Sequence, residues 1–189
     1  FALYETYLRH LNGKYPALRY MTIDPSGTGH PFGVFIGGYN PLTNEHIEIE
    51  SCEIQMGDVD PVTHELWSPQ KITSWLLSKC REYTIRKVAI ESNSGGQQIA
   101  IFLRANGIEC IMQNFGAPNA PNSRAAFIKL ANHFLDERKV MLKNQKLKSE
   151  LTIYNPTKDK EKFKGDVADA FLHYLWLAVG GIGFLRTQA

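Results

Sequence analysis

Four acidic residues stand at positions from which carboxylates commonly do chemistry. Asp24 ends the apolar run RYMTI and precedes a turn cluster, Pro-Ser-Gly-Thr-Gly, while Glu91 ends the apolar run RKVAI. Asp166 and Asp169 lie three residues apart at the start of the last predicted helix, so both project from one face of it. Because side chains at strand ends gather along one edge of an open α/β sheet, we expect these four carboxylates to meet there.

A cluster of carboxylates repels itself unless cations bind to it. Mg²⁺ and Mn²⁺ prefer carboxylate oxygen and water as ligands. Two such ions about 4 Å apart can activate a water molecule and stabilise the leaving oxygen when a phosphodiester is cleaved. We therefore predict a two-ion site formed by Asp24, Glu91, Asp166 and Asp169.

Each acidic residue taken singly also has a purely structural interpretation. Aspartate after a strand is a common turn former. Asp166 could cap its helix, and the helix dipole favours Asp169 in the first turn. The catalytic interpretation rests on the four residues occurring together, in this order and at these element ends.

The elements that must position these residues follow from periodicity and turn signals. Residues 1–14 are predicted to form a helix, part of an N-terminal arm over 1–18, and the core of a single 1–189 domain is predicted over about 19–180. Alternating or short apolar runs predict strands, whereas capped periodic segments predict helices. The strands are expected at 19–23, 32–39, 46–55, 86–90 and 108–112, and the helices at 70–83, 93–106, 123–138 and from 166 onward.

This order predicts an α/β fold with a mixed sheet. An antiparallel hairpin comes first, and αβ units then add parallel strands, so that helices flank the sheet. Residues 140–142 are expected to be a short extended piece and 143–151 a short basic segment. The apolar run from 170 to 185 contains His173 and several glycines and is short for a membrane span, which favours a buried helix.

Composition constrains the function only weakly. The 189 residues are 43% hydrophobic and 21% charged, with a formal net charge of +2, so overall charge neither supports nor excludes a DNA partner. The three cysteines form no C-x-x-C pair, which argues against a zinc site or a disulfide scaffold. Basic side chains are concentrated late in the chain, where they could hold a phosphate backbone; the candidates are Arg124, Lys129, Lys158, Lys160, Lys162 and Lys164.

Three motifs in series resemble the ribonuclease H-like nuclease superfamily. They are TIDPSGTG, VAIESNSGG and KGDVADAFLHYLW. Within that superfamily, they are most similar to the C-terminal nuclease domain of viral, phage-type DNA-packaging terminase large subunits, as is the stretch NSRAAFIKLANHFLDERKVMLK. The likeness covers most of residues 19–180. One departure is Lys164-Gly165, where the family commonly has His-Asp, and it leaves open whether Asp166 or Asp169 is the main ligand. The resemblance implies that Asp24, Glu91 and Asp166 are catalytic and bind metal, and we take Asp169 as an auxiliary ligand.

The resemblance implies a ribonuclease H-like fold and an endonuclease that uses two Mg²⁺ or Mn²⁺ ions to cut concatemeric double-stranded viral DNA during packaging. It also implies partners in a full-length protein: an ATPase motor domain, a small terminase subunit and a portal, inside the host cell at the procapsid portal and not in a membrane. The sequence has no G-x-x-x-x-G-K-[ST] loop, so ATP hydrolysis is not expected of this domain.

Two alternatives remain open at this point. One is a Holliday-junction resolvase or another recombination nuclease of the same fold. The other is a catalytically silent ribonuclease H-like module that binds DNA or protein.

Overall fold

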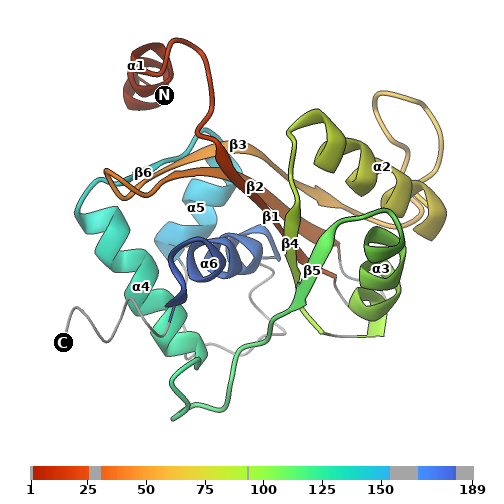
Figure 1. Cartoon of the computed structure of the whole chain (residues 1–189). Coiled ribbons are helices and arrows are strands. Elements are labelled where there is room, and N and C mark those ends of the chain that lie inside the picture. The colour runs from red at the N-terminus through yellow and green to blue at the C-terminus, as the bar shows by residue number, and fades with distance from the viewer. Residues whose placement is uncertain (1, 26–30, 93, 154–165, 182–189) are drawn as a thin grey trace.

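The chain folds around one mixed sheet of six strands (Figure 1). The computed structural model describes residues 2–25, 31–92, 94–153 and 166–181. The strand order is β5-β4-β1-β2-β3-β6; β2 is antiparallel to both neighbours, whereas the β1–β4, β4–β5 and β3–β6 pairs are parallel. The bounds are β1 Leu18–Asp24, β2 Phe32–Asn40, β3 Glu45–Ile54, β4 Lys87–Ile90, β5 Glu109–Met112 and β6 Val140–Met141. The antiparallel hairpin and the parallel additions predicted from the sequence are confirmed.

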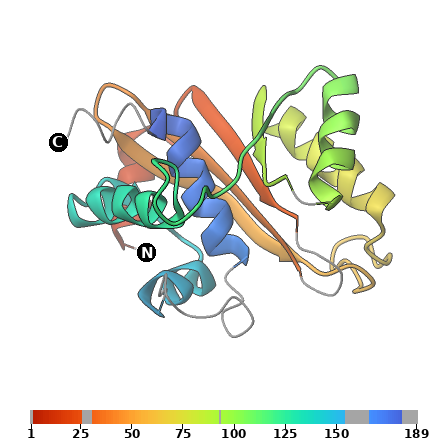
Figure 2. The same cartoon turned by 90° about the horizontal axis from the view of Figure 1, so that it is seen from below.

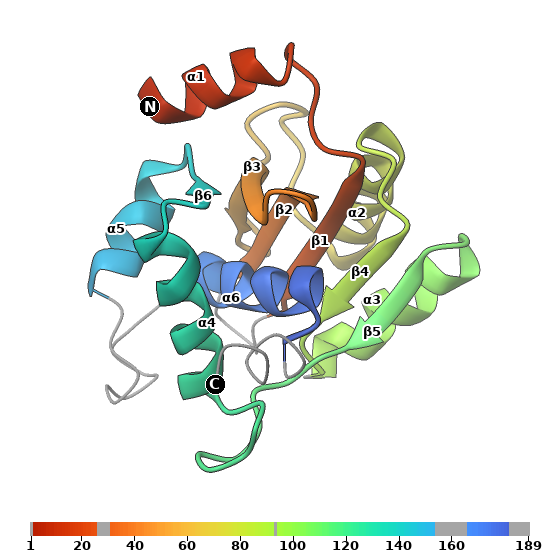
Figure 3. The same ribbon diagram turned by 60° about the vertical axis from the view of Figure 1, so that its left-hand side comes forward.

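Helices cover both faces of the sheet (Figure 3). Their bounds are α1 Ala2–His10, α2 Pro69–Glu82, α3 Ser94–Ala105, α4 Arg124–Asp136, α5 Gln145–Ile153 and α6 Asp166–Val179. Side chains alternate between the two faces of a strand, so each face has its own core. Met21 and Ile23 of β1 pack in the core with α2 and α3, whereas Phe35 of β2 packs with α4, α5 and α6.

Helix α6 lies across the second face and is the most buried helix of that layer (Figure 2). Its residues from Val167 to Leu175 are buried except Asp169, and Tyr174 donates a hydrogen bond to the carbonyl of Gly38. The described part of the 170–185 run is therefore the buried helix that its composition predicted. No helix among the described residues is long and apolar enough to cross a membrane.

Two segments differ in detail from the sequence prediction. The N-terminal helix is shorter than expected, because Asn12 and Gly13 have positive φ angles of 54° and 70°, which end it. The segment predicted only as basic contains α5, whose start is fixed by Asn144: its side-chain oxygen accepts hydrogen bonds from the backbone N–H groups of Lys146 and Leu147.

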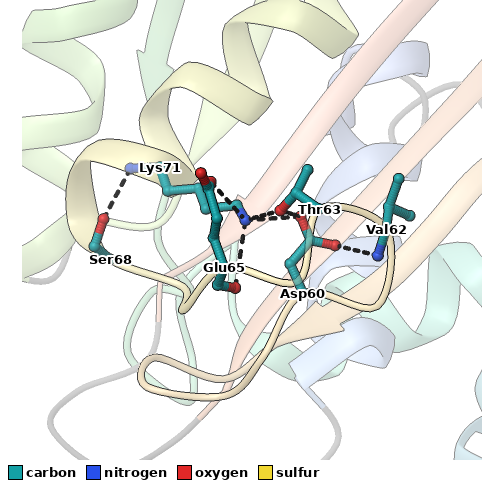
Figure 4. A network of polar contacts seen from close by, with 6 residues as sticks. All are labelled: Asp60, Val62, Thr63, Glu65, Ser68 and Lys71. Atoms are coloured by element: carbon teal, nitrogen blue, oxygen red, sulfur yellow. Dashed lines mark hydrogen bonds and ion pairs between the residues drawn. The ribbon is translucent and has the colours of Figure 1, made fainter.

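The 55–68 segment between β3 and α2 is an ordered loop rather than an irregular one (Figure 4). Asp60 is buried, accepts hydrogen bonds from the Val62 N–H and the Thr63 hydroxyl, and pairs with Lys71 at 2.9 Å. These donors lower the pKa of Asp60 to about 2. The pairing ties the loop to the first turn of α2, where Ser68 caps the helix.

Candidate active site

The ends of two neighbouring parallel strands bring Asp24 and Glu91 side by side. Strand β1 pairs with β4 so that Ile23 is opposite Ile90, and the Glu91 N–H donates to the Ile23 carbonyl at 3.0 Å. The next residue on each strand is the carboxylate, so both carboxylates leave the same edge of the sheet on the same face. The predicted meeting of Asp24 and Glu91 is therefore realised by the register of one strand pair.

The start of α6 packs against β2, beside Asp24 and Glu91. Asp24 is opposite Gly33 in the β1–β2 ladder. A Cβ added to Gly33 would lie 2.0 Å from the Asp166 carbonyl oxygen and 2.9 Å from the Val167 nitrogen. Only glycine allows the helix backbone to approach a strand so closely, so this position puts Asp166 directly next to Asp24.

A hydrogen bond between β1 and α6 fixes the helix further along. The Thr22 hydroxyl donates to the Ala170 carbonyl at 2.6 Å, and both residues are buried. Thr22 and Asp24 point to the same face of β1, because side chains alternate along a strand. The first turn of α6 therefore lies over the face that carries Asp24.

The pKa of Asp24 reflects its burial and the negative charges near it. Its side chain is 7% exposed. Burial raises the pKa of Asp24 well above its usual range, as do a hydrogen bond to Glu91 and the charges of Glu91, Asp169 and Asp166, in that order. The other three carboxylates predicted from the sequence thus all lie near enough to Asp24 to raise its pKa.

Asp169 has a basic partner among the described residues. It pairs with the guanidinium of Arg124, the first residue of α4. That guanidinium lies 4.7 Å from the centre of the Phe115 ring, and Phe115 in turn packs against His173, one helical turn beyond Asp169. Gln113 donates to the His173 ring nitrogen Nδ1 at 3.0 Å, which completes a network from the end of β5 to α6.

The donor set fits hard divalent cations, although the side chains are not gathered around one point. Carboxylate oxygens are the ligands that Mg²⁺ and Mn²⁺ prefer, and burial together with the neighbouring carboxylates raises the pKa of Asp24. Over the described part of the chain, no three His, Cys, Asp or Glu side chains stand close enough together to hold a single ion. Holding one ion between Asp24, Glu91 and Asp166 would therefore require their side chains to move closer together.

Two further glutamates border the site and were not predicted. Glu53 of β3 is opposite Gly33, so it occupies the same row of the sheet as Asp24, on the other side of the first turn of α6. Glu150 of α5 is buried and accepts a hydrogen bond from the Ala168 N–H at 3.2 Å. The alternation of β3 marks Glu53 as facing one side of the sheet, but no local sequence signal gives its register or the contact that Glu150 makes.

The predicted DNA-binding side chains are only partly described. Arg124 is at the site, where it pairs with Asp169, and Lys129 is exposed on α4. The remaining candidates, Lys158, Lys160, Lys162 and Lys164, lie outside the described residues.

The solved structures that resemble this chain include nuclease domains of viral terminases. The chain aligns with the nuclease domain of the large terminase of phage P22 with a TM-score of 0.56 at 13% identity, over 87% of this chain and 85% of that one. It aligns with the human cytomegalovirus terminase nuclease domain, soaked with Mn, with a TM-score of 0.55 at 13% identity, over 84% and 81% of the two chains. The Mn-bound large terminase nuclease domain of bacteriophage SPP1 gives a TM-score of 0.53 at 14% identity, over 84% and 85%.

These likenesses confirm the predicted fold class. The chain has the ribonuclease H-like fold of terminase nuclease domains, a mixed sheet flanked by helices, and the similarity spans most of both chains. No family model and no curated protein matches the sequence. At identities near 13%, the likeness establishes the fold, and the chemistry must be argued from the site itself.

Proposed function

We propose that this chain is a divalent-metal-dependent endonuclease domain that cuts double-stranded DNA. The observation that carries the proposal is the meeting of Asp24 and Glu91 at the ends of paired strands, with the first turn of α6 pressed onto Gly33 beside them. Buried carboxylates that face one another lower stability unless a cation joins them. The fold shared with terminase nuclease domains, two of them Mn-soaked or Mn-bound, supports the same chemistry.

Asp24, Glu91 and Asp166 would hold the ions, and we take Mg²⁺ or Mn²⁺ as the natural choice, with two ions in the complete site. Bound ions of this kind supply a nucleophilic water and neutralise charge on the scissile phosphate. Asp24 is central because both other carboxylates act on it. Asp169 has a different part: its pairing with Arg124 makes it an auxiliary ligand at most, and a support for that guanidinium.

Arg124 would then contact the DNA backbone at the edge of the metal site. Its guanidinium is held from two sides, by Asp169 and by the Phe115 ring, so little side-chain entropy is lost when a phosphate binds. Lys129, together with Lys158, Lys160, Lys162 and Lys164, would extend this contact along the backbone without reading sequence.

The biological role that we propose is cutting of concatemeric viral DNA during genome packaging. In a full-length protein the domain would work beside an ATPase motor domain, with a small terminase subunit and a portal as partners, inside the host cell at the procapsid portal. The shared fold with terminase nuclease domains supports this role.

The test is a nicking assay with supercoiled plasmid in Mn²⁺, Mg²⁺ or chelator. We expect wild type to nick only with metal, and Asp24→Asn, Glu91→Gln and Asp166→Asn each to lose most activity. Asp136→Asn, at the exposed end of α4, is the matched control and should cut like wild type. Equal nicking by all five proteins would remove the proposal, whereas selective cutting of four-way junctions would favour a resolvase.

A further inference from the structure

The start of α6 carries Asp166 and Asp169, and a side chain from another helix accepts one of its backbone N–H groups. Ser68 and Ser123 cap α2 and α4 by accepting backbone N–H groups of the first turn. The acceptor for the Ala168 N–H is the carboxylate of Glu150, from the neighbouring helix α5.

Helix α5 is itself anchored to the sheet at its start. Glu48 of β3 accepts the Lys143 and Asn144 N–H groups at 2.7 and 3.0 Å, and the Asn144 side chain donates to the Ser51 hydroxyl at 2.8 Å. These contacts fix the start of α5 relative to β3, and the hydrogen bond between Glu150 and Ala168 fixes the first turn of α6 relative to α5. The last contact in this series is the one that Glu150 makes.

Contacts from several elements hold the start of α6: Arg124 of α4 pairs with Asp169, and Glu150 of α5 accepts the Ala168 N–H. Gly33 lies beneath the Asp166 backbone, and Thr22 holds the Ala170 carbonyl. Glu150 approaches from the β3 side, next to the ion pair of Lys146 with Glu53. Glu53 is opposite Gly33, the residue that lies against the Asp166 backbone, so Glu150 contacts α6 from the β3 side of Asp166.

A buried glutamate stabilises a helix start less than a serine cap does, because its carboxylate must be removed from water. Its side chain is 7% exposed, and its second oxygen, Oε1, is buried with no hydrogen-bond partner among the described atoms. Burying a carboxylate in this way lowers stability, whereas a serine cap raises it. The benefit lies in geometry, since a cap supplied by α5 fixes α6 relative to the sheet.

We propose that Glu150 is a positioning residue that sets the first turn of α6, and with it Asp166, against Asp24. The inference rests on the proposed metal-dependent nuclease function and deepens it. A ligand carboxylate must be held within about 0.5 Å of its working position, and a misplacement of about 1 Å can cost roughly 100-fold in rate. Glu150 has no contact with DNA or metal in this role; it acts through the Ala168 N–H.

The test compares Glu150→Ala, which removes the acceptor, with Glu150→Gln, which keeps one acceptor oxygen. We expect Glu150→Ala to lower kcat for Mn²⁺-dependent nicking by roughly 10- to 100-fold, with the KM for DNA unchanged within about twofold. The Mn²⁺ concentration for half-maximal activity should rise about tenfold, as should the Kd for Mn²⁺ measured by calorimetry without DNA. Glu150→Gln should restore most of each loss.

Ser68→Ala, which removes the cap of α2, is the matched control because it lowers stability away from the site and should leave the Mn²⁺ dependence unchanged. If Glu150→Ala does not fold, Glu150→Met fills the same space without an acceptor and decides the question. Wild-type kcat and Mn²⁺ dependence in the folded alanine or methionine variant would overturn the proposal, as would an equal loss in Glu150→Gln. A wild-type protein that binds Mn²⁺ but does not cut would remove the nuclease function alone, since the calorimetric comparison still tests Glu150.

Discussion

Two buried carboxylates on this sheet have opposite surroundings. Glu48 of β3 is 1% exposed and is surrounded by donors: the Lys143 and Asn144 N–H groups and the Ser51 hydroxyl. Asp24 of β1 is 7% exposed and faces Glu91, Asp166 and Asp169. Burial alone therefore does not mark a functional acid; the sign of the charges around it does.

Glu48 and Asp24 show how a carboxylate that supports the architecture differs from one that we propose to be functional. The charge of Glu48 is compensated by protein groups, so it can serve the architecture by joining β3 to α5. The charge of Asp24 is opposed by the neighbouring carboxylates, so a bound cation would stabilise this edge. Four experiments test this contrast between Asp24 and Glu48.

The largest effect is expected for Asp24→Asn. Losing the central ligand should lower the single-turnover rate of Mn²⁺-dependent nicking at least about 1,000-fold, or about 4 kcal/mol of transition-state stabilisation. The free energy of unfolding in urea should equal or exceed that of wild type, because one of several facing negative charges is removed. A variant that cuts within tenfold of wild type, or that is clearly less stable, would break the contrast.

Glu48→Ala should show the reverse pattern in stability. Removing the acceptor leaves the donors of Lys143, Asn144 and Ser51 without their carboxylate, which should lower the free energy of unfolding by about 3 kcal/mol. Urea denaturation measures this directly. Glu48→Gln keeps one acceptor oxygen and should lose less; a fully stable alanine variant would show that the buried carboxylate contributes nothing to the architecture.

Adding Mn²⁺ should stabilise the catalytic edge and leave the β3–α5 junction unaffected. At a concentration about 100-fold above its Kd, the ion should add about 2.7 kcal/mol of stability, which is roughly 5 to 10 °C in Tm for a chain of this size. The shift should disappear in Asp24→Asn and persist in Glu48→Gln. The same shift in both variants would place the ion elsewhere.

The smallest effect concerns His46, a buried ionisable group on β3 that is kept neutral. Burial lowers its pKa to about 3, its Nδ1 lies 3.1 Å from the Tyr174 hydroxyl oxygen, and its ring stacks on Tyr39. Because the folded pKa is below the unfolded value of about 6.5, the unfolded state takes up the proton first as pH falls, and stability present above pH 6.5 is lost below it.

Between pH 8 and pH 5 this group should therefore remove about 2 kcal/mol from the free energy of unfolding of wild type. His46→Phe lacks the group, so the difference in stability between variant and wild type should shift by that amount in favour of the variant at pH 5. Urea titrations at the two pH values measure it. Parallel pH profiles for the two proteins would show that His46 does not titrate on unfolding.

Much of this architecture could be predicted from sequence because its signals are local. The alternating strand at residues 45–54, the serine caps at Ser68 and Ser123, and the hairpin between β2 and β3 each follow from a few adjacent residues. The positions of Asp24, Glu91 and Asp166 at element ends were also predicted, together with the order of the elements between them.

The contacts around those residues could not be predicted, because they join segments far apart in the chain. The place of Glu53 in the row of Asp24 depends on a register that shifts between Ile36 and Gly37. The pairing of Asp169 with Arg124 spans 45 residues, and the hydrogen bond from Ala168 to Glu150 spans 18 residues across two helices. α5 itself was missed because its short basic segment has a weak apolar periodicity and its start is fixed by contacts with β3.

Local sequence patterns specify which side chains carry negative charge and at which element ends they stand, since periodicity, caps and turns are encoded by neighbouring residues. Which of those charges face donors, a guanidinium or one another is set by the packing of distant segments. The physical reason is that charge compensation depends on distances of a few ångströms between separate elements, and strand register and helix packing alone set those distances.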